Sequence, residues 1–118
     1  MIGYRVKKQD NKWYFEFIPH NNKNQPIGRS ILFSSEAECH NAVTLLQRTL
    51  KNQRVGMKNN EVTAICQVEK GWIAQYYLNN EIIYQSRIYE AKQGCKKSIS
   101  SFRQKIDEYA SYLPDERT

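Results

Sequence analysis

The sequence predicts an α+β protein made of two tandem β-β-β-α repeats, with antiparallel sheets, helices packed on one face and approximate two-fold symmetry. The aromatic segment WYFEF at residues 13–17 is answered by WIAQY at residues 72–76. The pattern S-x2-[F/Y]-x5-C-x3-[V/I]-x2-[L/F] begins at Ser30 and begins again at Ser86. In both halves the apolar period then changes from two, typical of strands, to about 3.6, typical of helices.

Short runs of β-branched and aromatic residues predict the strands of the first repeat. These strands are expected at residues 4–8, 12–18 and 27–33. Asp10 and Asn11 separate the first two strands. The polar residues 19–26, bracketed by prolines, separate the next two. Because proline and asparagine favour turns, we expect this second connection to be a long hairpin loop.

The second repeat shows the same three runs with a shorter connection. Its strands are expected at residues 62–68, 72–78 and 82–86. Lys70-Gly71 forms the first predicted turn and Asn79-Asn80 the second, since asparagine tolerates the positive φ of a tight hairpin. Trp13 and Trp72 are 59 positions apart, whereas Ser30 and Ser86 are 56 apart. The three extra residues of the first repeat therefore fall in its long loop.

One amphipathic helix is predicted at the end of each repeat. The apolar stripe of the first helix is Cys39, Ala42, Val43, Leu46 and Leu50, and that of the second is Cys95, Ile99, Phe102, Ile106 and Tyr109. Ser35 and Glu38 have the spacing of a capping box, in which both side chains accept hydrogen bonds from backbone N–H groups at the start of a helix. Gly94 weakens the second helix by about 1 kcal/mol relative to alanine.

We expect the whole chain to form one domain. A unit of three strands and one helix buries too little apolar surface to be stable alone, so the two repeats are expected to share a core. The expected organisation is repeat one at residues 1–50, a linker at 51–60, repeat two at 61–109 and a tail at 110–118. Such a protein resembles a homodimer whose subunits have been joined.

The repeated motif resembles that of the YegP-like family of proteins of unknown function. The segment SILFSSEA at residues 30–37, with Val43, carries this resemblance in the first repeat, and SRIYEAKQ at residues 86–93, with Ile99, carries it in the second. Both copies depart from the Asn-Gly that usually precedes the third strand in this family. The resemblance implies a duplicated β-β-β-α fold, and it transfers no catalytic residue.

A second likeness is to the plant AP2 DNA-binding domain, which also has three antiparallel strands and a helix. Tyr4-Arg5-Val6, WYFEF at residues 13–17 and LFSSEA at residues 32–37 carry it. The second repeat has TAIC in place of the arginine-containing first strand. We attribute this likeness to shared topology, because one fold hosts many unrelated functions.

Positive charge is concentrated in the first repeat and the linker. Residues 1–60 contain ten Lys and Arg and four Asp and Glu, whereas residues 61–118 contain eight of each, so the net charge of +6 comes from the first part. The predicted binding residues are Arg5, Lys7, Lys8, Lys12, Tyr14, Lys23 and Arg29. Such a patch attracts phosphates or carboxylates, and Tyr14 offers a stacking surface. The alternative is that these cations only keep the protein soluble.

No catalytic or metal-binding constellation is predicted, and no cofactor. Cys39, Cys66 and Cys95 are odd in number and lack the spacing of metal ligands, so we expect reduced thiols. His40 follows Cys39, but adjacent residues on a helix point about 100° apart, which keeps the imidazole from activating the thiol.

The sequence therefore predicts a non-enzymatic, cytoplasmic binding module that contacts nucleic acid or an acidic protein surface, including as an inhibitor of a nucleic-acid-handling complex. The alternative function is structural, with homodimers formed through sheet edges. A third hypothesis is a small-molecule site between the repeats. No segment is long and apolar enough to span a membrane, so no membrane partner is expected.

Overall fold

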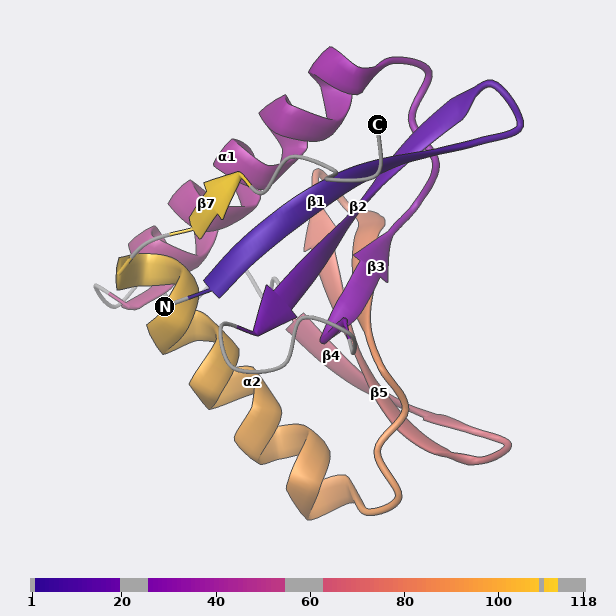
Figure 1. Cartoon of the computed structure of the whole chain (residues 1–118). Helices are drawn as coiled ribbons and strands as arrows, with labels where there is room; N and C mark the ends of the chain where they lie inside the picture. Colours follow the sequence, from indigo (N-terminus) through magenta and orange to yellow (C-terminus); the bar gives the residue numbers. More distant parts are fainter. Residues whose placement is uncertain (1, 20–25, 55–62, 109, 113–118) are drawn as a thin grey trace.

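The computed structural model describes residues 2–19, 26–54, 63–108 and 110–112 of the 118-residue chain (Figure 1). Its elements are β1 (Ile2–Gln9), β2 (Lys12–Pro19), β3 (Gly28–Ser30), α1 (Glu36–Arg54), β4 (Thr63–Val68), β5 (Gly71–Leu78), β6 (Glu81–Ser86), α2 (Lys92–Glu108) and β7 (Ala110–Tyr112). The α+β class expected from the sequence is confirmed. No helix among the described residues is long and apolar enough to cross a membrane.

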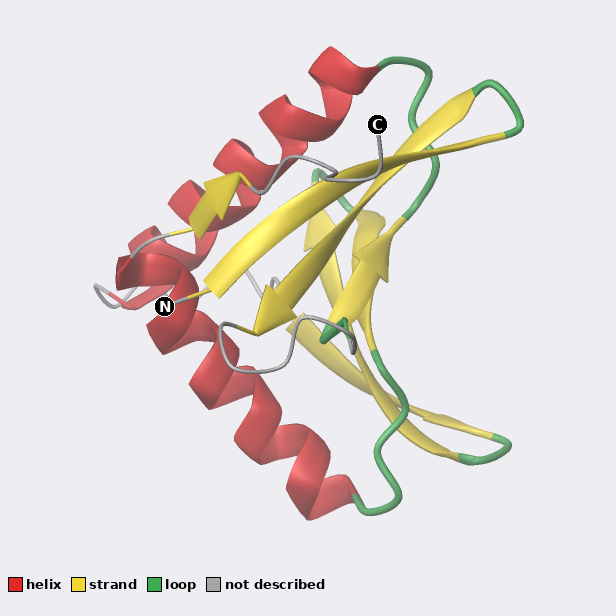
Figure 2. Cartoon of the chain, in the orientation of Figure 1, coloured by secondary structure: helices red, strands yellow, loops and turns green. Residues whose placement is uncertain are grey.

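The strands form one seven-stranded sheet in the order β4-β5-β6-β3-β2-β1-β7. All neighbouring strands run antiparallel except β1 and β7, which are parallel. The antiparallel pair β3 and β6 joins the two halves, with Gly28 opposite Ser86 and Ser30 opposite Tyr84. Both helices lie on the same side of the twisted sheet, so no described helix covers the other side (Figures 1 and 2).

Two of the three tight hairpins use the turn residues that the sequence indicates, whereas the β4–β5 turn is formed by Glu69 and Lys70, one position before the expected Lys70-Gly71. Asp10 and Asn11 have φ values of 50° and 65°, and Asn79 and Asn80 have 52° and 66°. Two successive residues with positive φ match the right-handed twist of the flanking strands, and asparagine and aspartate adopt this conformation at low cost. These turns fix the register of β1 with β2 and of β5 with β6.

The start of α1 is capped by the predicted pair. The backbone N–H of Glu38 donates to the Ser35 hydroxyl at 3.2 Å. The Glu38 carboxylate in turn accepts from the backbone N–H of Ser34 at 3.1 Å, one residue earlier than a standard capping box requires. The first turn of α1 also carries Glu36, whose negative charge suits the helix N-terminus.

The core lies between the sheet and the helices, and both halves contribute to it. Phe102 of α2 packs edge-on against Phe17 of β2, with ring centroids 5.0 Å apart, and against Tyr76 of β5 at 5.2 Å. Tyr84 is stacked on Phe102 at 5.5 Å. Leu46 of α1 is fully buried in the same cluster. Neither half therefore has a separate apolar core.

Some elements differ from expectation. β3 contains three residues instead of seven, and the chain returns to β2 through an isolated bridge between Phe33 and Trp13. β7 forms within the expected tail and adds to the edge of β1. Trp13 and Trp72, whose strand parity predicts the core face, are half-buried at the margin of the core. Helix α1 continues to Arg54, and the rest of the expected linker lies outside the described residues.

Candidate binding face of the sheet

The side of the sheet away from the helices, here called the open face, carries four of the predicted binding residues. Side chains alternate along a strand, so Phe15 fills the core while its neighbours Tyr14 and Glu16 point the other way. In the register of β1 and β2, Lys7 lies opposite Tyr14 and Arg5 lies opposite Glu16. Arg29 of β3 pairs with Glu16 from the other side.

Glu16 is the electrostatic centre of this group. Its Oε1 atom lies 3.2 Å from Nζ of Lys7 and 3.9 Å from a guanidinium nitrogen of Arg5. The residue is only 8% exposed, so its charge is weakly screened by water. Two cations therefore face one carboxylate, with Arg29 at the neighbouring position of β3, and the group keeps a positive surplus smaller than the sequence suggests.

Arg29 is held in place by two contacts. Its guanidinium lies over the ring of Tyr14, 4.1 Å from the centroid, and a terminal N–H donates to the side-chain oxygen of Gln9 at 3.2 Å. A cation over an aromatic face is attracted by the ring quadrupole. The contact orients the arginine before any partner binds. It also covers one face of the Tyr14 ring, which reduces the stacking surface expected from the sequence.

The other predicted residues do not join this group. Lys8 points to the helix side of the sheet and lies over Trp13, 5.5 Å from the ring centroid. Lys12 is exposed at the β1–β2 turn. Lys23 lies outside the described residues. The structure therefore brings together Arg5, Lys7, Tyr14 and Arg29.

The second half presents a neutral open face at the positions that the sequence repeat equates with these residues. Ala64 and Cys66 stand where the first half has Arg5 and Lys7, and Ile73 stands where it has Tyr14. Gln75 replaces Glu16, and Gln85 replaces Arg29. One sheet surface thus combines a cationic half and an uncharged half, consistent with the uneven charge of the sequence.

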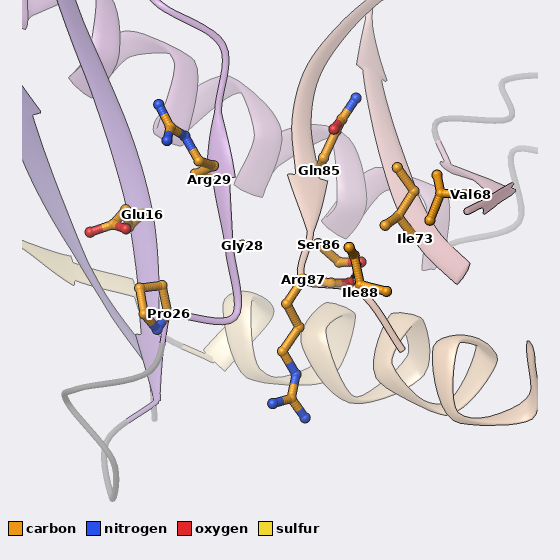
Figure 3. A pocket seen from close by; sticks show the side chains of 10 residues that line it. All are labelled: Glu16, Pro26, Gly28, Arg29, Val68, Ile73, Gln85, Ser86, Arg87 and Ile88. Carbon is orange, nitrogen blue, oxygen red and sulfur yellow. Dashed lines mark hydrogen bonds between the residues drawn. The ribbon is translucent and has the colours of Figure 1, made fainter. Parts of the chain in front are cut away.

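A cavity of about 520 Å³, the seam pocket, lies on the open face where the two halves meet. It is lined by Glu16, Pro26, Gly28, Arg29, Val68, Ile73, Gln85, Ser86, Arg87 and Ile88. Figure 3 shows Glu16, Pro26 and Arg29 on one side of the β3–β6 pair and Val68 and Ile73 on the other. The pocket therefore requires both halves of the chain.

Sequence reasoning did not identify Arg87, Ile88 or Ile73 as members of a site. Neighbouring residues of a strand point to opposite faces of the sheet. Because Ala74 points to the core, alternation predicts that Ile73 points to the open face. No sequence signal shows that β6 pairs with β3, and this pairing brings Arg87 and Ile88 beside the first half.

The thiols and the imidazole lack the features of catalytic groups. Burial raises the pKa of the Cys39 thiol to about 11, with the nearby charges of Glu36 and Glu38 adding to the effect. The Tyr4 hydroxyl lies 2.8 Å from Nδ1 of His40, so the ring is engaged away from the thiol. No group of three or more potential metal ligands occurs among the described residues.

Two solved structures share this fold. A UPF0339 protein from Shewanella oneidensis superposes with a TM-score of 0.73 at 15% sequence identity, over 98% of this chain and 94% of that one. The E. coli protein yegP, a protein of unknown function, superposes with a TM-score of 0.76 at 17% identity, over 99% and 95% of the two chains. The YegP-like resemblance is thus confirmed at the level of the fold. No protein-family model and no curated protein matches the sequence.

Proposed function

We propose that this chain, which shares its fold with YegP-like proteins, is a non-enzymatic binding module whose open face contacts an acidic segment of a partner protein. The observation that carries the proposal is the arrangement of Arg5 and Lys7 around Glu16, with Arg29 held over Tyr14 at the neighbouring position of β3. Charges held in place before binding lose little conformational freedom when a partner arrives, which favours affinity. Arginine also binds carboxylates through two parallel hydrogen bonds.

An acidic protein is favoured over a nucleic acid by one feature of this face, since the carboxylate of Glu16 repels phosphates and carboxylates alike. Arg29 lies over one face of the Tyr14 ring and leaves less of the ring open to an unpaired base. An acidic surface on a nucleic-acid-handling complex satisfies the same chemistry, and binding there would make the protein an inhibitor. Direct binding of nucleic acid to this face is the alternative, and the same experiment tests it.

The test compares a fluorescein-labelled oligoglutamate peptide with single-stranded and double-stranded oligonucleotides, by anisotropy at low and high salt. The variant Arg29→Gln places on β3 the residue that the second half carries at the equated position, Gln85, so the sheet should tolerate it. We expect peptide affinity to fall by about tenfold, the size of one charge-assisted contact. The exposed Lys96 of α2 lies off the open face, and Lys96→Gln is the matched control.

Tighter binding of either oligonucleotide than of the peptide, with the same loss in Arg29→Gln, would assign the face to nucleic acid. Equal losses in Arg29→Gln and Lys96→Gln would show that only net charge matters, which contradicts a defined face. Lys7→Ala is a poor test, because it removes the closest cation from the buried Glu16 and should lower stability as well.

The function rests on a molecule that we further propose to be a tandem duplication with pseudo-two-fold symmetry. Ser30 Oγ accepts from the backbone N–H of Phe15 at 2.8 Å, and Ser86 Oγ accepts from that of Ala74 at 2.9 Å. Each hydroxyl also donates to the carbonyl of the next residue at 2.8 Å. These matched contacts support the proposal.

The junction of the halves offers reciprocal support. The N–H of Ile31 donates to the carbonyl of Ile83 at 2.9 Å, and the N–H of Arg87 donates to that of Ile27 at 2.7 Å. The sequence repeat equates Ile27 with Ile83 and Ile31 with Arg87. Reciprocal contact of this kind is the property of a two-fold interface.

A second candidate function is homodimer formation through β4, the terminal strand at one edge of the sheet. The sequence of β4, TAICQV, contains no charged residue and no proline, and these are the usual means of keeping sheet edges apart. Multi-angle light scattering tests this function. A dimer that Cys66→Lys converts to a monomer supports it, and a monomer at high protein concentration rejects it.

A reducing cytoplasmic location is also proposed. Cys39, Cys66 and Cys95 are free thiols, which suits a compartment that keeps cysteines reduced.

A further inference from the structure

We propose that the seam pocket binds a small organic carboxylate with an aliphatic body, such as a short-chain or branched-chain acid. This goes beyond the proposed contact with an acidic protein, because it assigns a small-molecule site at the junction of the two halves, next to that face and sharing Glu16 and Arg29 with it. The volume of about 520 Å³ lies within the range of roughly 300 to 1,000 Å³ that is usual for ligand pockets.

The aliphatic body of the ligand is indicated by the apolar residues of the lining. Val68 of β4, Ile73 of β5 and Ile88 after β6 line the pocket, and Pro26 adds an apolar ring from the first half (Figure 3). Ile88 is 51% exposed, which is high for a large aliphatic side chain that lines a cavity. Covering these groups removes apolar surface from water and so favours an aliphatic ligand.

The negative head group is indicated by the charges around the pocket. Arg29 and Arg87 both line it, and Glu16 carries the single carboxylate among the lining residues. That carboxylate already faces Lys7 at 3.2 Å and Arg5 at 3.9 Å, which lie outside the lining. The lining therefore has two positive guanidinium groups and one carboxylate that is already neutralised by cations outside it. The resulting positive charge attracts an anion.

Both arginines are oriented by aromatic rings. Arg29 lies 4.1 Å from the centroid of Tyr14, and Arg87 lies 5.0 Å from that of Tyr89. The two guanidinium groups point away from each other (Figure 3), so a carboxylate head group pairs with one of them, and the planar fork of a guanidinium matches a carboxylate. The amide of Gln85 supplies a further polar group in the lining.

The difference between the halves explains why space is open here. The sequence repeat equates Val68, Ile73 and Gln85 with Gln9, Tyr14 and Arg29. In the first half the long side chain of Arg29 covers Tyr14 and reaches Gln9, so it fills the corresponding space. In the second half the shorter Gln85 leaves room beside Ile73, which lines the pocket and is 8% exposed. The pocket thus arises from the differences at these three equated positions.

The test is a titration of the full chain, followed by amide NMR shifts, with hexanoate, hexanol and hexylammonium as probes of one length. Hexanoate should give saturable shifts centred on Gly28, Ile73, Gln85 and Ile88, hexanol should bind at least about tenfold more weakly, and hexylammonium should not bind. Equal affinity for hexanoate and hexanol would overturn the carboxylate assignment. Absence of saturable shifts with hexanoate would overturn the site.

Two variants locate the site. Ile88→Ser removes exposed apolar lining and should weaken hexanoate by about tenfold, whereas Leu32→Ser, at the equated position of the first half and 39% exposed, should leave it unchanged. Gln85→Arg should fill the pocket as Arg29 fills its counterpart and abolish binding. Equal effects of Ile88→Ser and Leu32→Ser would overturn the location. Ile88→Ser keeps Arg5, Lys7 and Arg29, so oligoglutamate binding measured in this variant separates failure of the pocket proposal from failure of the acidic-protein proposal.

Discussion

Gly28 is the position where the junction of the two halves can be tested most directly. It lies on β3 opposite Ser86 of β6, and a Cβ atom added there would stand 2.8 Å from Cα of Ser86 and 2.5 Å from the hydroxyl of Tyr84. It would also meet the carbonyl oxygen of Gln85. Two of these neighbours are backbone atoms, so a side-chain rotation cannot relieve the contact and β3 must move away from β6.

The expected cost of Gly28→Ala is about 2–4 kcal/mol of unfolding free energy. Overpacking of this kind costs about 1–3 kcal/mol. Separation of the strands also weakens the hydrogen bonds from Ile31 to Ile83 and from Arg87 to Ile27, each worth about 1 kcal/mol. Urea denaturation followed by tryptophan fluorescence measures the change, since Trp13 and Trp72 report on one half each.

Gly94→Ala is the matched control, because the added Cβ at Gly94 of α2 meets only the ring edge of Tyr89 at 3.9 Å. It should stabilise the protein by about 1 kcal/mol through helix propensity. A Gly28→Ala protein within about 0.5 kcal/mol of the parent would refute the reasoning about the junction. So would separate unfolding transitions of single-tryptophan variants, since the halves share one core.

Four other predictions follow from named contacts. Ser30→Ala should lower the unfolding free energy by about 1–3 kcal/mol, because it leaves the buried N–H of Phe15 without its acceptor. Ser86→Ala should lower it less, because Ser86 is half-exposed. Calorimetry that gives the reverse order would contradict this. Tyr84→Phe should be neutral or stabilise the protein by up to about 1 kcal/mol, since the buried hydroxyl has no hydrogen-bond partner among the described residues. A decrease in unfolding free energy above about 1 kcal/mol in urea denaturation would contradict this. Cys66 should react with a thiol reagent before the fully buried Cys39 and Cys95, and mass spectrometry of partially labelled native protein would show any other order. Burial raises the pKa of Cys39 from 9.0 to about 11 and the pKa of Tyr84 well above 10.0. The unfolded chain therefore loses these protons at lower pH than the folded protein, and stability should fall as pH rises above about 9. A denaturation midpoint that stays constant between about pH 8 and pH 11 would contradict these pKa directions.

The candidate site was only partly predictable. Strand alternation is local, so the sequence places Arg5 and Lys7 together on one face. The neutralising role of Glu16 and the covering of Tyr14 by Arg29 depend on the register between β1, β2 and β3, which a run of cations does not reveal. Lys8, predicted as a site residue beside the β1–β2 turn, lies on the helix side over Trp13, because its strand parity is opposite to that of Arg5 and Lys7.

The sequence by itself determined the local structure: the tight turns at Asp10-Asn11 and Asn79-Asn80, the strand runs and the two amphipathic helices. These features depend on backbone preferences and on side-chain spacing within a few residues. The pairing of β3 with β6 and of β7 with β1 was decided by the tertiary structure. Backbone hydrogen bonds between strands are nearly independent of side-chain identity, so sequence alone does not state which edges meet. The seam pocket follows from that pairing, and for this reason it is visible only in the folded protein.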